Sequence, residues 1–529
     1  MRTATSRPLA RWYLFGLYLL TPFAASKGQV PQSYQPAGPA SKASLSPRWN
    51  VLNLLNVMAG NHLSGASTRE NLVIIATHRG DWKDYPENSE SAIREAIENG
   101  SEAVELDVQP TADQFPDTYN LNGGSPIPGC ILAHDTGTMR LTDPLLINAT
   151  QQGYGSNPPF TTLTEKQLLG LPIRASHGQY LAQRAGNTLL QNAPNGTQTG
   201  PDHFMTLYDA LQILTQYTAT GANNTGLYFD TPYYTGATGP LLIIDVKLQK
   251  NDTDAEATKT LAGCTTELRN FYASAHNGSP SYDVPLVNSV MFKFKLSSLL
   301  PSGTALEAVT PSQASGMIGS ACRNILDSQG FTGWQPTWKS YPRLIVGVLN
   351  AAILNAGTNN SVGANPIYSA FKNAYVAGTG FATSGTNCMV QFEFDQSNLS
   401  GQWGKGFDPS KLFMDDLNSS AGASRLGYGY ATWQLPYFEP EGFTTESGTN
   451  GIQCCTQYYN DTGNDVPTLT QNQFIVPDFK SATLFPSSYG ETSITTDTVD
   501  GSCALLSAKG KRVVTNVGSS PLPICQSFK

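Results

Sequence analysis

Eight short apolar runs, most of them rich in Val and Ile, follow one another along this chain of 529 residues. Near-continuous apolar strands are typical of a parallel sheet that is covered on both faces, and strands that alternate with helical segments indicate an α/β fold. The runs are LVIIATH (72–78), EAVELDV (102–108), CILAHD (130–135), LLIIDVK (241–247), SVMFKFK (289–295), RLIVGVL (343–349), CMVQFEF (388–394) and GYATWQL (429–435). Their number predicts a (β/α)8 TIM barrel with long loop insertions and a C-terminal extension.

Two helices are predicted between these runs. SESAIREAIENG begins with a Ser and ends with a Gly, and its Ala and Ile residues form one apolar stripe, as in an amphipathic helix with Ser89 or Asn88 as its N-cap. A second helix is predicted over residues 203–217. We assign residues 1–26 to a signal peptide, 27–68 to a polar linker or N-terminal wrap, 69–470 to the barrel and 471–529 to the C-terminal extension.

The first residues predict export. Arg2, Arg7 and Arg11 precede the apolar stretch Trp12–Ala25, which is shorter than the ~20 residues that span a bilayer. A cleaved signal peptide is therefore favoured over an uncleaved membrane anchor. Ten N-x-S/T sites predict a secreted glycoprotein, with association with the cell wall left open: Asn99, Asn148, Asn195, Asn223, Asn251, Asn277, Asn359, Asn398, Asn418 and Asn460.

Eight cysteines in an exported chain predict disulfides, with the pairing left open. The formal net charge is −8 and no basic run occurs. This composition gives no sign of a nucleic-acid-binding protein.

Ionisable residues fall near the C-terminal ends of the first four runs. They are His78-Arg79, Glu105 and Asp107, His134-Asp135, and Asp245 and Lys247. In a parallel barrel these ends meet on the face that carries the active site. We therefore expect the four groups to lie close together.

Glu105 and Asp107 are two residues apart in a strand and so point to the same face. Together with Asp245 they form an oxygen ligand set that suits Ca²⁺ or Mg²⁺. Two alternatives need no metal: Glu105 and Asp107 could be held by salt bridges, or Asp245 could simply pair with Lys247.

The neighbouring residues are those that phosphoryl transfer requires. His78 and His134 can act as general base and acid near neutral pH. Arg79 and Lys247 can bind phosphate oxygens. Lys293 and Lys295 could also bind phosphate or be solvated, and Glu393 and Trp433 are weaker candidates.

The stretch THRGDWKDYPENSESAIREAIENGSEAVELDVQPTAD, followed by ILAHD, resembles the glycerophosphodiester phosphodiesterase family. FMTLYDAL and LLIIDVK are similar to a later helix and strand of that family. The resemblance implies a barrel with Glu105, Asp107 and Asp245 as metal ligands. It also implies His78 and His134 as the catalytic pair, Arg79 on the phosphate, and Glu87 and Asn88 lining the site.

The resemblance further implies that a hydroxyl of the substrate attacks phosphorus, giving a cyclic phosphate that water then opens. Two features depart from the family pattern: Asp245 stands where the family usually has Glu, and the segment between Asp113 and Cys130 is longer. Asp-x-Lys is closer to sphingomyelinase D-type phospholipases, which lack the HRG and PEN motifs.

Three functions follow as hypotheses. The first is a secreted, metal-dependent phosphodiesterase that hydrolyses a soluble glycerophosphodiester to glycerol phosphate and an alcohol. The second is a lysophospholipase D-like or sphingomyelinase D-like enzyme that forms a cyclic phosphate from a lysolipid head group at a membrane surface. The third is a cell-surface protein without enzymatic activity.

Overall fold

A computed structural model of the chain describes residues 58, 73–82, 85–98, 101–118, 122–138, 141–142, 146, 158–174, 202–217, 239–247, 254–275, 289–295, 343–347, 389–395, 427–432 and 493–496. All of them belong to one compact unit, Pro39–Lys529. The strands are β1 (Ile74–Thr77), β2 (Ala103–Pro110), β3 (Cys130–Leu132), β4 (Leu241–Val246), β5 (Val290–Lys295), β6 (Arg343–Gly347), β7 (Met389–Asp395), β8 (Gly427–Thr432) and β9 (Ser493–Thr496). The helices are α2 (Glu90–Glu98), the 3-10 turn η2 (Phe160–Thr162), α3 (Glu165–Leu168), α4 (Leu207–Tyr217) and α5 (Asp254–Ala275).

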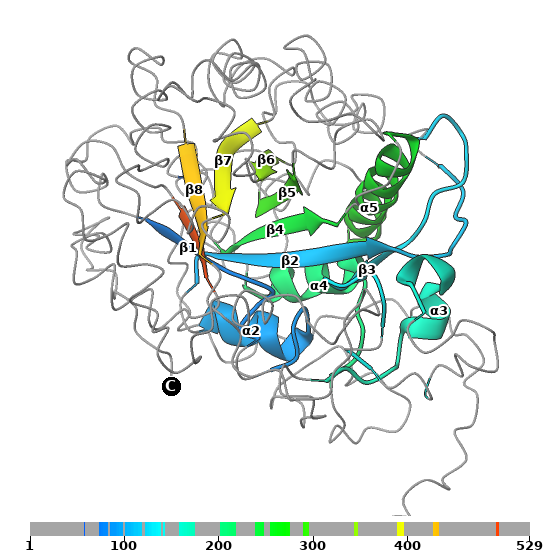
Figure 1. The fold of residues 1–529 in the computed structure, drawn as a ribbon, viewed down its shortest axis with the longest axis horizontal. Coiled ribbons are helices and arrows are strands. Elements are labelled where there is room, and N and C mark those ends of the chain that lie inside the picture. The colour runs from blue at the N-terminus through cyan, green and yellow to red at the C-terminus, as the bar shows by residue number, and fades with distance from the viewer. Residues whose placement is uncertain are drawn as a thin grey trace, which may run out of the picture. The chain divides into compact units, whose positions relative to one another are not determined.

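Within the described residues, eight parallel strands pair in the order β1-β2-β4-β5-β6-β7-β8-β9, and β9 pairs back onto β1 (Figure 1). This pairing closes the sheet on itself, as a parallel barrel requires. The predicted α/β barrel is therefore confirmed. Every described side chain of β1 and β4 is buried, in agreement with their largely apolar sequences, IIAT and LLIIDV.

One strand assignment was wrong, and one barrel strand was not predicted. The run 130–135 does not supply a barrel strand, because β3 pairs antiparallel with the end of β2, from Val108 to Pro110. The remaining parallel strand is β9, which lies inside the predicted C-terminal extension and joins β1 to β8. Its sequence, SITT, is too short and too polar to stand out as a buried strand. The other domain boundaries stay predictions.

Both predicted helices form. In α2 the Ala and Ile residues of the apolar stripe are buried, and Ser89 Oγ accepts a hydrogen bond from Ala92 N, so Ser89 is the N-cap. The second helix, α4, begins at Leu207, four residues later than predicted. Thr206 caps it, because its Oγ1 accepts from Asp209 N while Asp209 Oδ2 accepts from Thr206 N.

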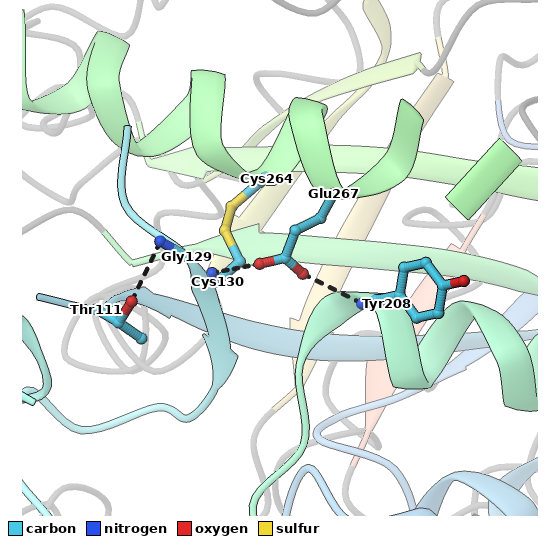
Figure 2. The surroundings of a disulfide bond; sticks show 6 residues. All are labelled: Thr111, Gly129, Cys130, Tyr208, Cys264 and Glu267. Atoms are coloured by element: carbon cyan, nitrogen blue, oxygen red, sulfur yellow. Dashed lines mark hydrogen bonds between the residues drawn. A yellow bond between two sulfur atoms is a disulfide. The ribbon is translucent and has the colours of Figure 1, made fainter. Parts of the chain in front are cut away.

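A disulfide joins Cys130, at the start of β3, to Cys264 in α5 (Figure 2). Beside it, the Glu267 carboxylate accepts hydrogen bonds from the backbone N–H groups of Cys130 and Tyr208. These contacts attach β3 and the first turn of α4 to α5. The other six cysteines, the signal peptide and all ten N-x-S/T sites lie outside the described residues. Among the helices that the structure describes, none is both long and apolar enough to cross a membrane.

Candidate active site

Three buried carboxylates from two neighbouring strands form the centre of the candidate site. Glu105 and Asp107 project from the same face of β2, and Asp107 is the register partner of Asp245 on β4. One oxygen from each of the three lies within 4.8 Å of the others. The structure therefore brings together the three predicted metal ligands. Glu105 and Asp107 lie within β2, which continues to Pro110 through its pairing with β3, whereas Asp245 is the second-last residue of β4.

Two lysines contact these carboxylates. Lys247 Nζ lies 2.7 Å from Asp107 Oδ1 and 2.6 Å from Asp245 Oδ2. Lys293 Nζ lies 2.7 Å from Glu105 Oε1 and 3.4 Å from Asp245 Oδ2. The side chain of Lys247 is 10% exposed and that of Lys293 is 3% exposed. The solvated alternative for Lys293 was therefore wrong, and the side chain of Lys295 lies outside the described residues.

Arg79 continues the network from the loop after β1. Its guanidinium lies 2.9 Å from Glu87 Oε2 and 3.2 Å from Asp107 Oδ2. Its backbone N–H donates to Glu105 Oε2. Asn88 contacts Asp107 twice: the Asp107 N–H donates to Asn88 Oδ1, and the Asn88 side-chain amide donates to Asp107 Oδ2. The HRG and PEN motifs thus meet around one carboxylate.

The turn after β1 has an unusual backbone. Arg79 and Asn88 have φ of 55° and 56°, and Gly80 has φ of 74°. A Cβ at Gly80 would lie 2.8 Å from the backbone carbon of Ala92 in α2. Gly80 therefore allows both the positive φ and the close approach of the helix. The preceding residue, Arg79, contacts Asp107.

The two histidines lie near the same carboxylate. Burial would raise the pKa of the Asp107 carboxyl, but electrostatic interaction with Lys247 above all, and then with His134, Arg79 and His78, holds this pKa well below its ordinary value. His134 Nδ1 lies 2.9 Å from Asp135 Oδ1, and Gln109 donates to the His134 carbonyl. The His134 side chain is 14% exposed, whereas His78 is buried and its backbone N–H donates to Thr496 O.

The lysines are held in their charged form. Burial lowers the pKa of Lys247, but Asp107 and Asp245 outweigh that effect and raise it. Burial likewise lowers the pKa of Lys293, and Asp245, Glu105 and Glu393 together raise it well above its ordinary value.

The donor set and the charge balance both fit a divalent cation. Carboxylate oxygens are the ligands that Ca²⁺ and Mg²⁺ prefer. Among the described residues, ion pairs join five carboxylates to three cations at this site, so the formal charges leave an excess of two negative charges. The carboxylates are Glu87, Glu105, Asp107, Asp245 and Glu393, and the cations are Arg79, Lys247 and Lys293. One divalent ion would balance that excess. Salt bridges and a metal site are therefore compatible in this cluster.

Sequence reasoning underrated one part of the site. Glu393 on β7 lies 2.9 Å from Lys293 Nζ, and Thr495 on β9 donates to Glu393 Oε2. Lys293 is the register partner of Asp245, a relationship between β4 and β5 that the sequence of either strand alone does not show. Thr495 carried no signal, since it lies in a strand that was not predicted. Trp433 lies outside the described residues.

Fold and site together define a phosphoryl-transfer type of centre on a parallel α/β barrel. The sequence model of the glycerophosphoryl diester phosphodiesterase family matches residues 78–116. Those residues contain the HRG and PEN motifs and both β2 carboxylates. The recognised resemblance to this family is therefore confirmed over these residues, and it supports an enzyme of the glycerophosphodiester phosphodiesterase type.

One relative in sequence carries the name of this family, and another is uncharacterized. Glycerophosphodiester phosphodiesterase 1 of Bos taurus is 41% identical over 66 residues, which is 12% of this chain and 16% of the bovine protein. The chain thus matches about a sixth of that enzyme's length. An uncharacterized protein of Sinorhizobium fredii, y4eD, is 24% identical over 87% of this chain and 92% of its own length.

A solved structure of similar arrangement comes from Silicibacter pomeroyi and is described as a putative glycerophosphoryl diester phosphodiesterase. It shares 11% identity, covers 83% of this chain and 95% of its own, and has a TM-score of 0.37.

Proposed function

We propose that this protein hydrolyses a glycerophosphodiester to glycerol phosphate and an alcohol, using a divalent cation and two histidines. The observation that carries the proposal is the arrangement around Asp107. Asp107 belongs to a carboxylate triad that suits a hard cation. It also contacts two cations that can bind phosphate, Arg79 and Lys247, and it interacts electrostatically with His78 and His134.

Glu105, Asp107 and Asp245 would hold the metal, which supplies Lewis-acid stabilisation of phosphoryl charge when bound. Lys247 and Arg79 would bind the other phosphoryl oxygens. Lys247 suits this role because it is more exposed than Lys293 and lies just beyond the end of β4. Arg79 suits it because Glu87 and Asp107 fix its guanidinium.

The histidines would move the protons. A neighbouring hydroxyl of the substrate attacks phosphorus and gives its proton to His78, while the bond from phosphorus to the leaving alcohol breaks. His134 gives a proton to that alcohol oxygen. In the second step water opens the cyclic phosphate, with the proton transfers reversed. Asp135 supports the role of His134, since it occupies Nδ1 and directs Nε2 to the reaction.

The test is ³¹P NMR of glycerophosphocholine and lysophosphatidylcholine with the purified protein in Ca²⁺, Mg²⁺ or EDTA. We expect glycerol phosphate from glycerophosphocholine only when metal is present. His134→Ala should abolish it, and His203→Gln, at a half-buried histidine outside the triad, should not. Turnover of the lipid alone, without turnover of glycerophosphocholine, would contradict the proposed substrate class.

We also propose that the protein is exported and loses its first ~26 residues. The Cys130–Cys264 disulfide supports this, because structural disulfides persist in oxidising compartments. Expression in a eukaryotic host should release the protein into the medium with a new N-terminus near Ser26. N-glycosidase treatment should then lower its mass. An intracellular product with an intact N-terminus would contradict export.

A further inference from the structure

Lys293 differs from the other cations of the site in what it contacts. Among the described residues its ammonium is 2.7 Å from Glu105, 2.9 Å from Glu393 and 3.4 Å from Asp245. All three partners are buried carboxylates. Arg79 also joins the triad to an outer carboxylate, Glu87, but only through Asp107, whereas Lys293 joins both Glu105 and Asp245 to Glu393.

Lys293 therefore supplies part of the positive charge that a metal ion would supply. Glu105 and Asp245 are two of the three metal-ligand candidates, and an ammonium and a divalent cation compete for the same carboxylate oxygens. The competition is strong because the cluster is buried, where charges a few ångströms apart are poorly screened by water.

Glu393 provides a second position for the same ammonium. It lies on β7, outside the triad, and Thr495 of β9 holds its other oxygen through a hydrogen bond of 3.0 Å. The ammonium already lies 2.9 Å from Glu393, so this contact can remain when a cation takes the oxygens of Glu105 and Asp245.

We propose that Lys293 is an internal competitor of the metal ion. Without metal it neutralises Glu105 and Asp245, and when a cation binds to these two carboxylates it keeps its contact with Glu393 alone. Lys293 is thus a positioning residue that sets metal affinity and keeps the empty site assembled. This inference rests on the proposed metal-dependent function and specifies how the same site is regulated by its metal.

The competition predicts opposite effects for two neutral substitutions. Lys293→Met removes the competitor, so Ca²⁺ and Mg²⁺ should bind roughly tenfold or more tightly. Glu393→Gln removes the alternative position and leaves Lys293 on the ligands, so both ions should bind more weakly by a similar factor. A purely structural role would shift both affinities in one direction.

The measurement is isothermal titration calorimetry of the metal-stripped full chain with each ion, and melting temperatures in EDTA and in excess metal. Lys293→Met should melt at a lower temperature than the wild type in EDTA and gain more from metal. Lys166→Met, an exposed lysine outside the site, should leave both affinities and the metal-induced shift unchanged.

The double variant Lys293→Met with Glu393→Gln separates competition from a simple change of nearby charge. Without Lys293 there is nothing for Glu393 to hold, so Glu393→Gln should weaken binding much less in that background. An equal effect in both backgrounds would overturn the proposal. If Lys293→Met does not fold but the double variant does, the charge argument is supported. Glu393→Gln alone then tests the proposal, because unchanged or tighter metal binding in that variant contradicts competition.

The proposed function can fail separately. A wild type that binds neither ion and turns over phosphodiester in EDTA would remove the metal-dependent function and this inference with it. A wild type that binds metal, with Lys293→Met and Glu393→Gln shifting affinity in the same direction, would remove only the inference.

Discussion

Asp107 and Asp245 are register partners on the neighbouring parallel strands β2 and β4, and Lys247 Nζ lies between their carboxylates at 2.7 and 2.6 Å. This relationship places two like charges side by side in a buried position, where they are stable only with a cation between them. The lysine supplies part of that positive charge. Carboxylates still outnumber cations in the surrounding network, and a divalent ion would balance the remaining negative charge.

Asp245 offers a direct test of the metal site. Asp245→Asn should lower kcat/KM for a glycerophosphodiester by roughly 100-fold or more, because it removes a charged ligand candidate. Asp245→Glu should keep most of the activity, since it preserves the charge and carries the residue that the family usually has there. Metal titrations of activity would measure both. Equal losses in the two variants would contradict a ligand role for the charge.

His134 should act as general acid with the help of Asp135. Removing such a group costs about 10²–10⁴-fold in rate, so His134→Ala should fall in that range. Asp135→Asn should cost less, roughly tenfold, because it disturbs only the orientation of the imidazole. Both should leave metal affinity nearly unchanged. Activity within twofold of the wild type in His134→Ala would exclude His134 as the acid.

The sequence was sufficient for the residues that lie close to one another along one motif. Strand parity placed Glu105 and Asp107 on one face, and the run LLIIDVK placed Asp245 beside them. Lys293 and Glu393 were undervalued because their roles depend on side-chain contacts between β5, β7 and β9, which are not neighbours in the sheet. Non-local contacts of that kind leave no periodic signal in a single strand.

Two features of the fold were hidden for the same reason. The run CILAHD has the composition of a barrel strand, but its antiparallel pairing to β2 follows from tertiary contacts, including the Cys130–Cys264 disulfide. SITT has only one apolar side chain, and its place between β1 and β8 supplies the burial that its sequence does not show.

Gly80 should be intolerant of a side chain. Gly80→Ala should lower the free energy of unfolding by about 2 kcal/mol or more and reduce activity, because the new Cβ would meet the Ala92 backbone and the positive φ disfavours it. Gly123→Ala is the matched control. Gly123 has φ of +62° with nothing within 4 Å of an added Cβ, so it separates strain from crowding. Chemical denaturation of both variants gives the comparison.

If Gly80→Ala and Gly123→Ala lose the same stability, the close approach of α2 contributes nothing beyond the backbone conformation. If only Gly80→Ala loses activity, the position of Arg79 depends on that approach, as the contacts of Arg79 with Glu87 and Asp107 imply.

Glu165 should make the stability depend on pH. It lies in α3 and forms a hydrogen bond with Glu267, beside the disulfide that Figure 2 shows. Burial raises the pKa of Glu165 to about 7 from its ordinary 4.5; the bond to Glu267 lowers it, and Asp113 and Asp209 raise it further. Because the folded state holds the proton more tightly than the unfolded state, the stabilisation is complete below pH 4.5 and is lost as pH rises to about 7.

Glu165→Gln should therefore flatten the dependence of stability on pH between about 4.5 and 7. The neutral amide keeps a hydrogen-bonding group towards Glu267 and cannot ionise, so the variant should gain on the order of 2 kcal/mol relative to the wild type at pH 8 and little at pH 4. Denaturation under oxidising conditions at both pH values measures this difference. Glu267→Gln should instead lose stability at both, because the Glu267 carboxylate also accepts from Cys130 N and Tyr208 N. A Glu165→Gln curve parallel to that of the wild type would show that the proton is not shared between these two carboxyls.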